Sequence, residues 1–274
     1  MDSFLYLHEQ QVRLLSFLLC FVLLAFWEWR APRRPLTVSK PLRWVNNLAL
    51  MIINTLVLRF ALPVLAVGFA VHVQQQQWGM FNAITWPFWL EVVLAVLLLD
   101  LAIYWQHRLM HVVPLLWRLH RMHHSDRDLD VTSAIRFHPI EMVLSMTYKL
   151  GLIALLGPAV TAVIVFEIVL NSFSLFNHTN GYLPEKWDRR LRWFLVTPDM
   201  HRIHHSKYFV NETNSNYGVL TSLWDRLFGS YTEQPKEGQQ KLSLGVEGFS
   251  SLGRAQYLSG LLMTPFLSRK KLPK

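Results

Sequence analysis

Histidines are concentrated in three short clusters of this 274-residue chain, and their spacing favours metal binding. On a helix, residues three and four apart share a face, so each cluster would present several imidazoles in one direction. Imidazole is the commonest neutral metal ligand and suits Fe, Zn, Cu and Ni, whereas carboxylate clusters suit Mg, Ca or Mn. A single histidine pair is more often a packed or surface pair, but the repeated His-Arg-x-His-His-Ser string argues against that interpretation. The clusters comprise His107 and His111, then His120, His123 and His124, and finally His201, His204 and His205.

The number of histidines indicates more than one metal ion. Ten lie between His107 and His205, and the two outside the clusters are His138 and His178. One structural zinc takes four ligands, so ten imidazoles suggest two metals close together. Zinc cannot change oxidation state. Two irons in an imidazole-rich pocket would suit oxygen activation.

The elements that position these histidines must lie in a membrane. Hydrophobic residues make up 52% of the chain, charged residues only 16%, and the mean hydropathy is +0.23. The net charge of +9 would suggest nucleic acid in a soluble domain. Here, however, the basic residues cluster beside apolar spans, where they serve topology and contact anionic lipid, so no nucleic-acid partner is expected. The single Cys20 excludes a disulfide framework or an iron–sulfur cluster from this chain alone.

Apolar runs predict five membrane crossings. The first lacks a cleavage site and is expected to stay as an anchor. The connector 30–43 is basic and should face the cytoplasm, whereas the linker 72–87 has no charged residue and suits the outer side. This alternation places the histidines on the cytoplasmic side. The expected spans are residues 12–29, 44–71 with a tilt or kink, 88–106, and a hairpin within 142–176 that is broken at Gly157-Pro158.

These patterns predict an all-α fold, a multi-pass membrane helix bundle with a cytosolic helical cap that holds a histidine-rich di-metal site. Three regions are expected along the chain. Residues 1–87 would form N-terminal spans and connectors, residues 88–232 the catalytic core, and residues 233–274 a tail on the membrane surface whose basic end, 269–274, lies near lipid head groups.

Two acidic residues accompany the histidines. Asp100 shares a helical stripe with Tyr104, His107 and His111. It could orient a ligating imidazole, or it could simply be a buried partner of Arg108 or Tyr104. Glu141 is the nearest candidate for a general base, and its alternative role is a hydrogen bond to His138.

Several further motifs accompany the clusters, and together they resemble the fatty acid hydroxylase/sterol desaturase superfamily of membrane di-iron enzymes. The resemblance covers about residues 100–231. It implies metal ligation by the eight clustered histidines and suggests His138 and His178 as further ligands. The motifs are Arg136-Phe-His138-Pro-Ile-Glu141, Phe176-Asn-His178-Thr-Asn, Asn216-Tyr-Gly and Trp224-Asp-Arg-Leu-Phe-Gly229.

One position departs from the pattern. Some members of the superfamily carry a histidine four residues before the one that matches His178, but here that position is Ser174. A site with one fewer imidazole could use water or Asn216 instead.

The resemblance implies an O2-dependent oxidoreductase with two iron ions that hydroxylates or desaturates a membrane lipid. The sequence does not separate an alcohol product from an alkene. The chain has neither a cytochrome-like His-Pro-Gly-Gly nor a flavin fingerprint, so electrons are expected from an external ferredoxin or cytochrome system.

Two other classes of protein stay open at this point. A membrane-bound zinc hydrolase would need a general base beside few ligands, and only Glu141 offers one. A divalent-metal transporter should place its polar ligands near mid-membrane on broken helices, whereas here they cluster at one end of a span.

Overall fold

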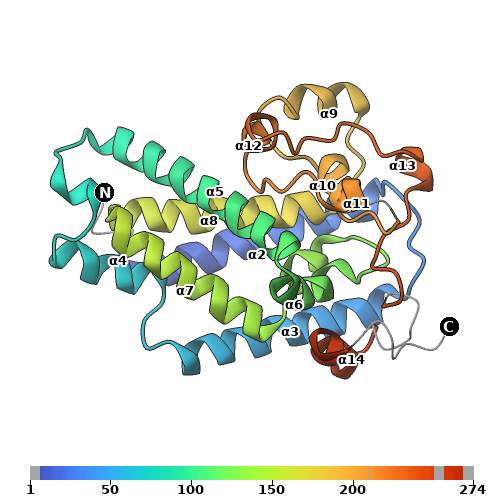
Figure 1. The fold of residues 1–274 in the computed structure, drawn as a ribbon, viewed down its shortest axis with the longest axis horizontal. Coiled ribbons are helices and arrows are strands. Elements are labelled where there is room, and N and C mark those ends of the chain that lie inside the picture. The colour runs from blue at the N-terminus through green and yellow to red at the C-terminus, as the bar shows by residue number, and fades with distance from the viewer. Residues whose placement is uncertain (1–6, 209, 250–255, 268–274) are drawn as a thin grey trace.

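The computed structural model describes residues 7–208, 210–249 and 256–267, and these residues form helices and loops (Figure 1). Within these ranges there are isolated bridges, such as Pro32 with Gly181, but no strand. The predicted all-α fold is therefore confirmed. In chain order the elements are α2 Glu9–Arg30, α3 Lys40–Ala61, α4 Ala66–Gln75, η1 Met80–Ala83, α5 Phe88–Val112, α6 Pro114–His124, η2 Val131–Ile135, α7 Pro139–Leu156, α8 Val160–His178, α9 Glu185–Leu191, α10 Pro198–His204, α11 Val210–Thr213, α12 Leu223–Leu227, α13 Gly238–Lys241, α14 Leu258–Met263 and η4 Thr264–Phe266.

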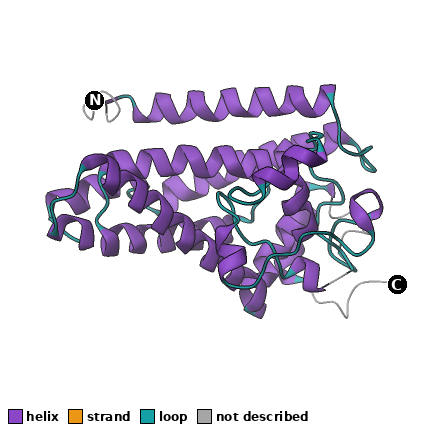
Figure 2. Ribbon diagram, turned by 90° about the horizontal axis from the view of Figure 1, so that it is seen from above, coloured by secondary structure: helices purple, strands orange, loops and turns teal. Residues whose placement is uncertain are grey.

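Five segments are long and apolar enough to cross a membrane, as predicted, and their helices run alongside one another (Figure 2). The second segment is divided. α3 ends at Ala61 and α4 begins at Ala66, and Pro63 lies in the break between them. Proline has no backbone N–H and cannot continue a helix in its interior, so the kink expected in this span is a complete interruption.

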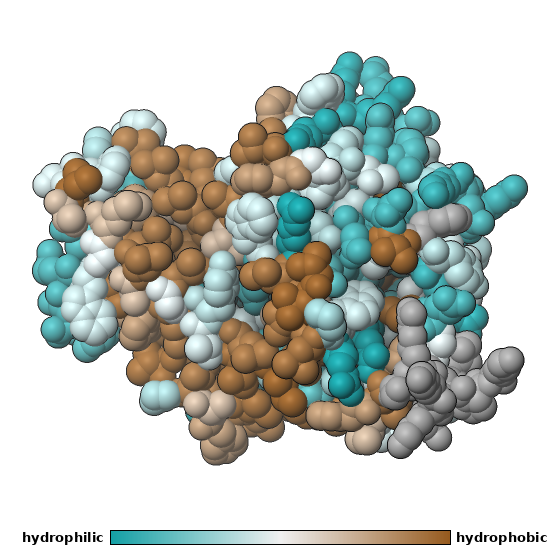
Figure 3. All heavy atoms as spheres, in the orientation of Figure 1, coloured by the Kyte–Doolittle hydropathy of each residue, from teal (hydrophilic) through white to brown (hydrophobic). Residues whose placement is uncertain are grey.

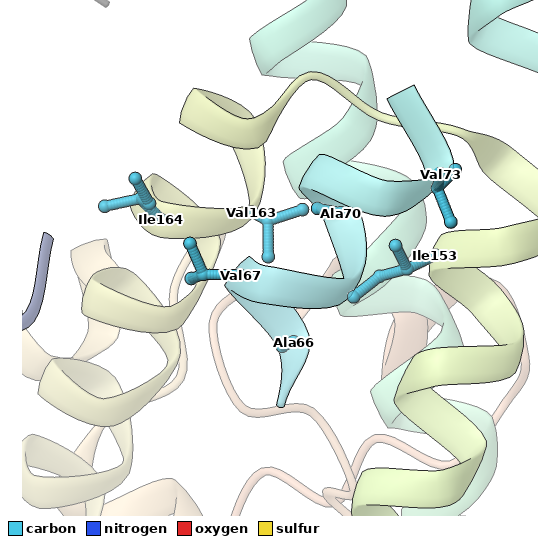
Figure 4. Packing of buried hydrophobic residues seen from close by; sticks show 7 residues of the cluster. All are labelled: Ala66, Val67, Ala70, Val73, Ile153, Val163 and Ile164. Atoms are coloured by element: carbon cyan, nitrogen blue, oxygen red, sulfur yellow. The ribbon is translucent and has the colours of Figure 1, made fainter. Parts of the chain in front are cut away.

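The short helix α4 packs between the two helices of the hairpin. Its small and β-branched residues Val67 and Ala70 lie against α7 and α8, where Ile153, Val163 and Ile164 are also buried (Figure 4). Within a bilayer, helices associate through close van der Waals packing of such side chains and not through their removal from water. This cluster therefore stabilises the end of the bundle that lies away from the histidines.

The hairpin turn is closed by glycine. Gly157 ends α7 with φ +65°, and a Cβ at this position would overlap the carbonyl oxygen of Trp78. Both the left-handed backbone and the close contact require glycine here. Asn82 also donates to the Gly157 carbonyl at 3.0 Å, so the 72–87 linker and the hairpin turn meet at the same end of the bundle.

At the opposite end, short helices and loops form a cap. Its surface is mostly hydrophilic, whereas the surface over α5 and α7 is largely hydrophobic (Figure 3). The basic connector belongs to this cap. We expected its charges to serve topology and lipid contact, but Arg33 pairs with Asp199, and Arg43 is buried between Asp126 and Asp130. These arginines therefore fasten the connector to the cap.

The C-terminal segment lies against the bundle. Leu261 of α14 packs on Leu50 of α3 and Met122 of α6. Arg121 donates to the carbonyl oxygens of Thr264 and Leu267, both at 2.6 Å. The basic end predicted to contact head groups, residues 269–274, lies outside the described residues.

Candidate metal centre

Four helices end beside one another where the bundle meets the cap (Figure 1). α5 carries histidines in its last turns, α6 and α10 carry the two repeated strings, and α8 ends with His178. α10 is fixed by Thr197, whose hydroxyl accepts from Met200 N at 3.3 Å and donates to Asp188 at 2.6 Å. The helix ends therefore gather imidazoles from distant parts of the sequence.

Nine of the ten candidate histidines form two groups in which the ligand nitrogens lie within 4.8 Å of one another. The groups adjoin, since the His124 and His205 rings stack with their centroids 4.2 Å apart. The first histidine group contains His107, His111, His120, His124 and His204, and the second histidine group contains His123, His178, His201 and His205.

In the first histidine group, the contacts of the Nδ1 atoms show in which direction the Nε2 lone pairs point. His107 Nδ1 lies 2.7 Å from the Tyr217 carbonyl oxygen, and His204 Nδ1 lies 2.7 Å from that of Ser215. A carbonyl oxygen only accepts, so each Nδ1 must carry the proton, and each neutral ring turns the Nε2 lone pair inward. These two Nε2 atoms are 3.0 Å apart. Two facing lone pairs repel unless a cation lies beside both.

The second group repeats this arrangement. His178 Nδ1 donates to the Ser174 carbonyl at 2.7 Å, and His123 Nδ1 to that of Arg136 at 3.3 Å. Their Nε2 atoms are 3.1 Å apart. In both groups, backbone carbonyls outside the site fix the tautomer that a metal ligand needs.

Several other ring nitrogens are buried with no hydrogen-bond partner among the described residues. They are both nitrogens of His111 and His124, Nε2 of His120, and Nδ1 of His201 and His205. A buried polar group without a partner is costly, and metal coordination would satisfy one nitrogen of each of these rings. The residues therefore fit a metal, and a nitrogen-rich set suits iron, zinc or copper.

Five histidines of the two repeated strings, which lie in the cap, are held in the neutral form. Burial, and next the neighbouring imidazoles, place the pKa values of His123, His124, His201, His204 and His205 well below the usual histidine value. A neutral imidazole keeps the lone pair that a metal requires, so these five are available as ligands at pH 7.

Glu141 contacts the site, but not through the histidine that we named as its alternative partner. Its Oε1 lies 2.6 Å from His120 Nδ1, and the carboxylate is buried. It therefore orients a histidine of the first group. The structure does not bring His138 into either group, because its Nδ1 accepts from Ile140 N and its Nε2 lies 3.2 Å from the Leu262 carbonyl.

Asp100 supports the site from further away. It accepts from Leu220 N, Thr221 N and, at 2.8 Å, Trp224 Nε1. These contacts involve neither a histidine nor the two partners considered from the sequence, Arg108 and Tyr104. Asp100 thus holds the loop 217–221, and this loop supplies the carbonyl that binds His107.

Asn216 has a similar supporting position. Its Nδ2 donates to the Met200 and Thr232 carbonyls, and its Oδ1 accepts from Thr232 N. Its φ of +53° is a left-handed conformation that asparagine tolerates better than most residues. The bend places the preceding carbonyl, that of Ser215, against His204. Its side chain is fully engaged with backbone and does not join the histidines.

A cavity of about 360 Å³ leads from the histidines into the bundle. Histidines of both groups line one end, and apolar residues such as Phe17, Met51, Ile103 and Leu170 line much of the remainder. Its volume is in the range of small-molecule sites. An apolar chain in this cavity would lie beside both groups.

The supporting contacts could not be found from sequence patterns. The Tyr217, Ser215, Ser174 and Arg136 carbonyls leave no mark in the sequence, because every residue has one. The Asn216-Tyr-Gly motif was a partial signal, since it marks the turn that aims two of these carbonyls.

Comparison with known proteins agrees with this geometry. The sequence model of the fatty acid hydroxylase family matches residues 92–230, about half of the chain, so the chain belongs to this family. Ornithine lipid hydroxylase of Rhizobium tropici is 32% identical over 166 residues, which cover 60% of this chain and 47% of that protein. Human alkylglycerol monooxygenase is 30% identical over 166 residues, covering 60% and 35%, and the Delta(7)-sterol 5(6)-desaturase of Eremothecium gossypii is 32% identical over 149 residues, covering 54% and 39%.

The chain spans about half or less of the length of these relatives. The shared part includes the region that carries both histidine groups, since the family match runs from α5 to the end of the Trp224 motif. No solved structure matches the chain.

Proposed function

We propose that this chain is a membrane oxidoreductase that uses O2 and two iron ions to hydroxylate or desaturate a lipid. The observation that carries the proposal is the pairing of inward-facing Nε2 lone pairs in two adjoining groups. Names of the relatives support the reaction class, because they describe hydroxylation, monooxygenation and desaturation of lipids. The catalytic core is proposed to be residues 88–232, with 1–87 as spans and connectors and 233–274 as a surface tail.

In this proposal the nine grouped histidines hold the metals. Bound irons would supply O2 activation and the removal of hydrogen from an unreactive C–H bond, with electrons from an external ferredoxin or cytochrome system. The protein's own part is positioning. The Tyr217 and Ser174 carbonyls and Glu141 hold imidazoles in place, and the cavity would keep an apolar chain beside them.

Metal analysis and isotope labelling test the proposal together. The purified chain is expected to contain two irons, and with NADPH, ferredoxin, ferredoxin reductase and a membrane lipid extract it should consume O2. Under labelled O2, a hydroxylated lipid carries the label, whereas a desaturated lipid has lost two hydrogens and carries none. One zinc per chain with turnover that needs no O2 would refute the proposal and favour a zinc hydrolase.

We further propose that the histidine end faces the cytoplasm, where soluble reductants are found. The connector and the histidines lie at one end of the bundle, and the 72–87 linker lies at the other (Figure 1). In a Cys20→Ser background, a cysteine at exposed Gln75 should react with an impermeant reagent added outside, and one at exposed Ser39 should not. The reverse labelling pattern would reject this orientation.

A further inference from the structure

We propose that Lys149, at the end of the cavity far from the histidines, binds an uncharged oxygen of the lipid substrate, such as a hydroxyl or an ester carbonyl. This contact would set which carbon of the lipid lies beside the two histidine groups. The inference rests on the proposed function, because it takes the cavity as the place where the lipid is held.

A polar stripe on α7 faces the cavity. Glu141, Ser145 and Lys149 are four residues apart and all line it, so they share one face of the helix. Gln106 of α5 donates to Ser145 Oγ at 2.6 Å across the cavity wall. At 1.5 Å per residue, Lys149 lies about 12 Å along the helix from Glu141. The stripe therefore extends from the candidate metal centre toward the middle of the span.

The ammonium of Lys149 belongs to a chain of ion pairs. Its Nζ lies 2.7 Å from Glu167 Oε1, and Glu167 Oε2 lies 2.8 Å from Arg13 of α2. Arg13 also pairs with Glu9 at 2.8 Å. Two cations thus meet two carboxylates, so the cluster has no net charge. Ionisable residues within spanning helices are rare and usually functional.

Charge balance selects the kind of group that Lys149 can bind. An anion would add an uncompensated charge in a region of low dielectric. A neutral oxygen adds none, and it can accept from an ammonium that has three N–H donors and, among the described residues, only Glu167 as an oxygen partner. Asn171 of α8, one turn from Glu167, lines the same cavity and could provide a further polar contact for such a group.

A purely structural role for the ion pairs makes a different prediction. If the cluster only ties α2, α7 and α8 together, then Arg13 and Lys149 should matter equally. Lys149 lines the cavity, however, whereas the described lining includes neither Arg13 nor Glu167. Arg13 is therefore the matched control, because it pairs with the same carboxylate from outside the cavity.

The test measures binding of three radiolabelled probes of equal chain length to the metal-loaded protein in nanodiscs, without an electron donor. The probes are hexadecanol, hexadecane and palmitate. Lys149→Met should weaken hexadecanol binding about tenfold to a hundredfold, the range for a lost hydrogen bond to a charged group, and leave hexadecane binding unchanged. Lys149→Arg should retain most of the hexadecanol affinity, and Arg13→Gln should retain nearly all of it.

Three results would overturn the inference: equal hexadecanol affinity in Lys149→Met and the unaltered protein, an equal loss in Arg13→Gln, or tighter binding of palmitate than of hexadecanol. In Lys149→Met the buried Glu167 keeps only Arg13 as a partner among the described residues, which could prevent folding. The double variant Lys149→Met/Glu167→Gln removes this carboxylate, and it should show the same loss as the single variant. Because no turnover is needed, iron content and O2-dependent oxidation are scored separately. A failed binding prediction would therefore leave the proposed function standing, and loss of the proposed function would not alter the binding result.

Discussion

The two histidine groups are built from the same repeated string, but the string is used in opposite ways. In the α6 string, His120 and His124 enter the first group and His123 enters the second. In the α10 string, His201 and His205 enter the second group and His204 enters the first. Each string therefore supplies an i,i+4 pair to one group and a single histidine to the other, because adjacent helical residues point about 100° apart.

The groups differ in what a third helix adds. α5 gives the first group an i,i+4 pair, His107 and His111. α8 gives the second group His178 alone, and the position four residues earlier is Ser174. The count of five against four thus comes from one side chain. Ser174 lines the cavity, so the second group is less filled on the side where a lipid would lie.

The largest expected effect tests whether the groups act as one unit. His204→Ala removes a member of the first group, and His123→Ala removes a member of the second. Each variant should lose bound iron and reduce lipid oxidation below detection, because ligands of a shared centre cannot be removed independently. Iron per chain and product formation are the measurements. His72 lies near Trp78 in the linker outside both groups, so His72→Ala should change neither.

If His123→Ala kept iron in the first group and retained turnover, the two groups would be separate sites. In that case it would not matter for function that each repeated string supplies histidines to both groups.

The next largest effect concerns the buried charges that join α3 to the segment after α6. Arg43 bonds Asp126, Asp130 and the Asp128 carbonyl, so Arg43→Met leaves two buried carboxylates without this partner. Breaking a buried pair in this way costs about 3–5 kcal/mol. Thermal unfolding should show the loss, and Arg59→Met, at an exposed position on the same helix, should have little effect.

The same contacts predict a pH dependence of stability. Burial alone would raise the pKa of Asp126, but the charges of Arg43 and Arg136 hold it at about 2, below the usual 3.8. A carboxyl with a lowered pKa stabilises the folded state above its unfolded pKa, and this contribution is lost as the pH falls from about 4 toward 2. Arg43→Met should therefore flatten the acid limb of the stability curve. An unchanged acid limb would contradict this account.

Much of the site could be predicted from the sequence because helical periodicity alone aligns residues three and four apart. This is why His107 with His111, and each repeated string, were recognised as clusters. Periodicity does not predict which of two adjacent histidines, such as His123 and His124, faces which neighbouring helix. The division of His123 from His124 depends on how α5 packs on α6 and on α8, and on how α8 packs on α10, and that packing is tertiary.

The acidic candidates show the same limit in another form. Asp100 was placed near the histidines by its stripe on α5, yet its partners are Leu220, Thr221 and Trp224, more than a hundred residues later. The connector arginines looked like lipid contacts because they flank apolar spans, but their partners are acids of the cap. Sequence patterns reveal local geometry, whereas contacts between distant segments need the fold.

A smaller effect is expected from a carboxylate contact that only the first group has among the described residues. Glu141 orients His120, a contact with no carboxylate counterpart in the second group among the described residues. Glu141→Gln keeps the shape but weakens the hydrogen bond, and loss of such an orienting partner typically lowers metal affinity about 10–100-fold. Because the two groups are expected to act as one unit, a chelator should release both irons at a lower concentration than from the unaltered protein. Release of both irons at the original chelator concentration would mean that Glu141 does not support metal binding.

The smallest expected change would make the two groups alike. Ser174→His restores an i,i+4 pair on α8, so that the second group would contain five imidazoles, as the first does. The new ring would lie one turn before His178, at a position that already lines the cavity, so little conformational entropy would be lost when it binds metal. We therefore expect the metal to be bound about tenfold more tightly, which corresponds to about 1.4 kcal/mol. Catalytic metal sites keep an open position, so the same ring should slow lipid oxidation while metal content stays full. Ser174→Ala is the matched control, since the Ser174 group that binds His178 is the backbone carbonyl, and it should leave both affinity and rate near their original values. Faster oxidation by Ser174→His would show that the second group lacks a ligand; slower oxidation with tighter metal binding would show that its open side is where the reaction takes place.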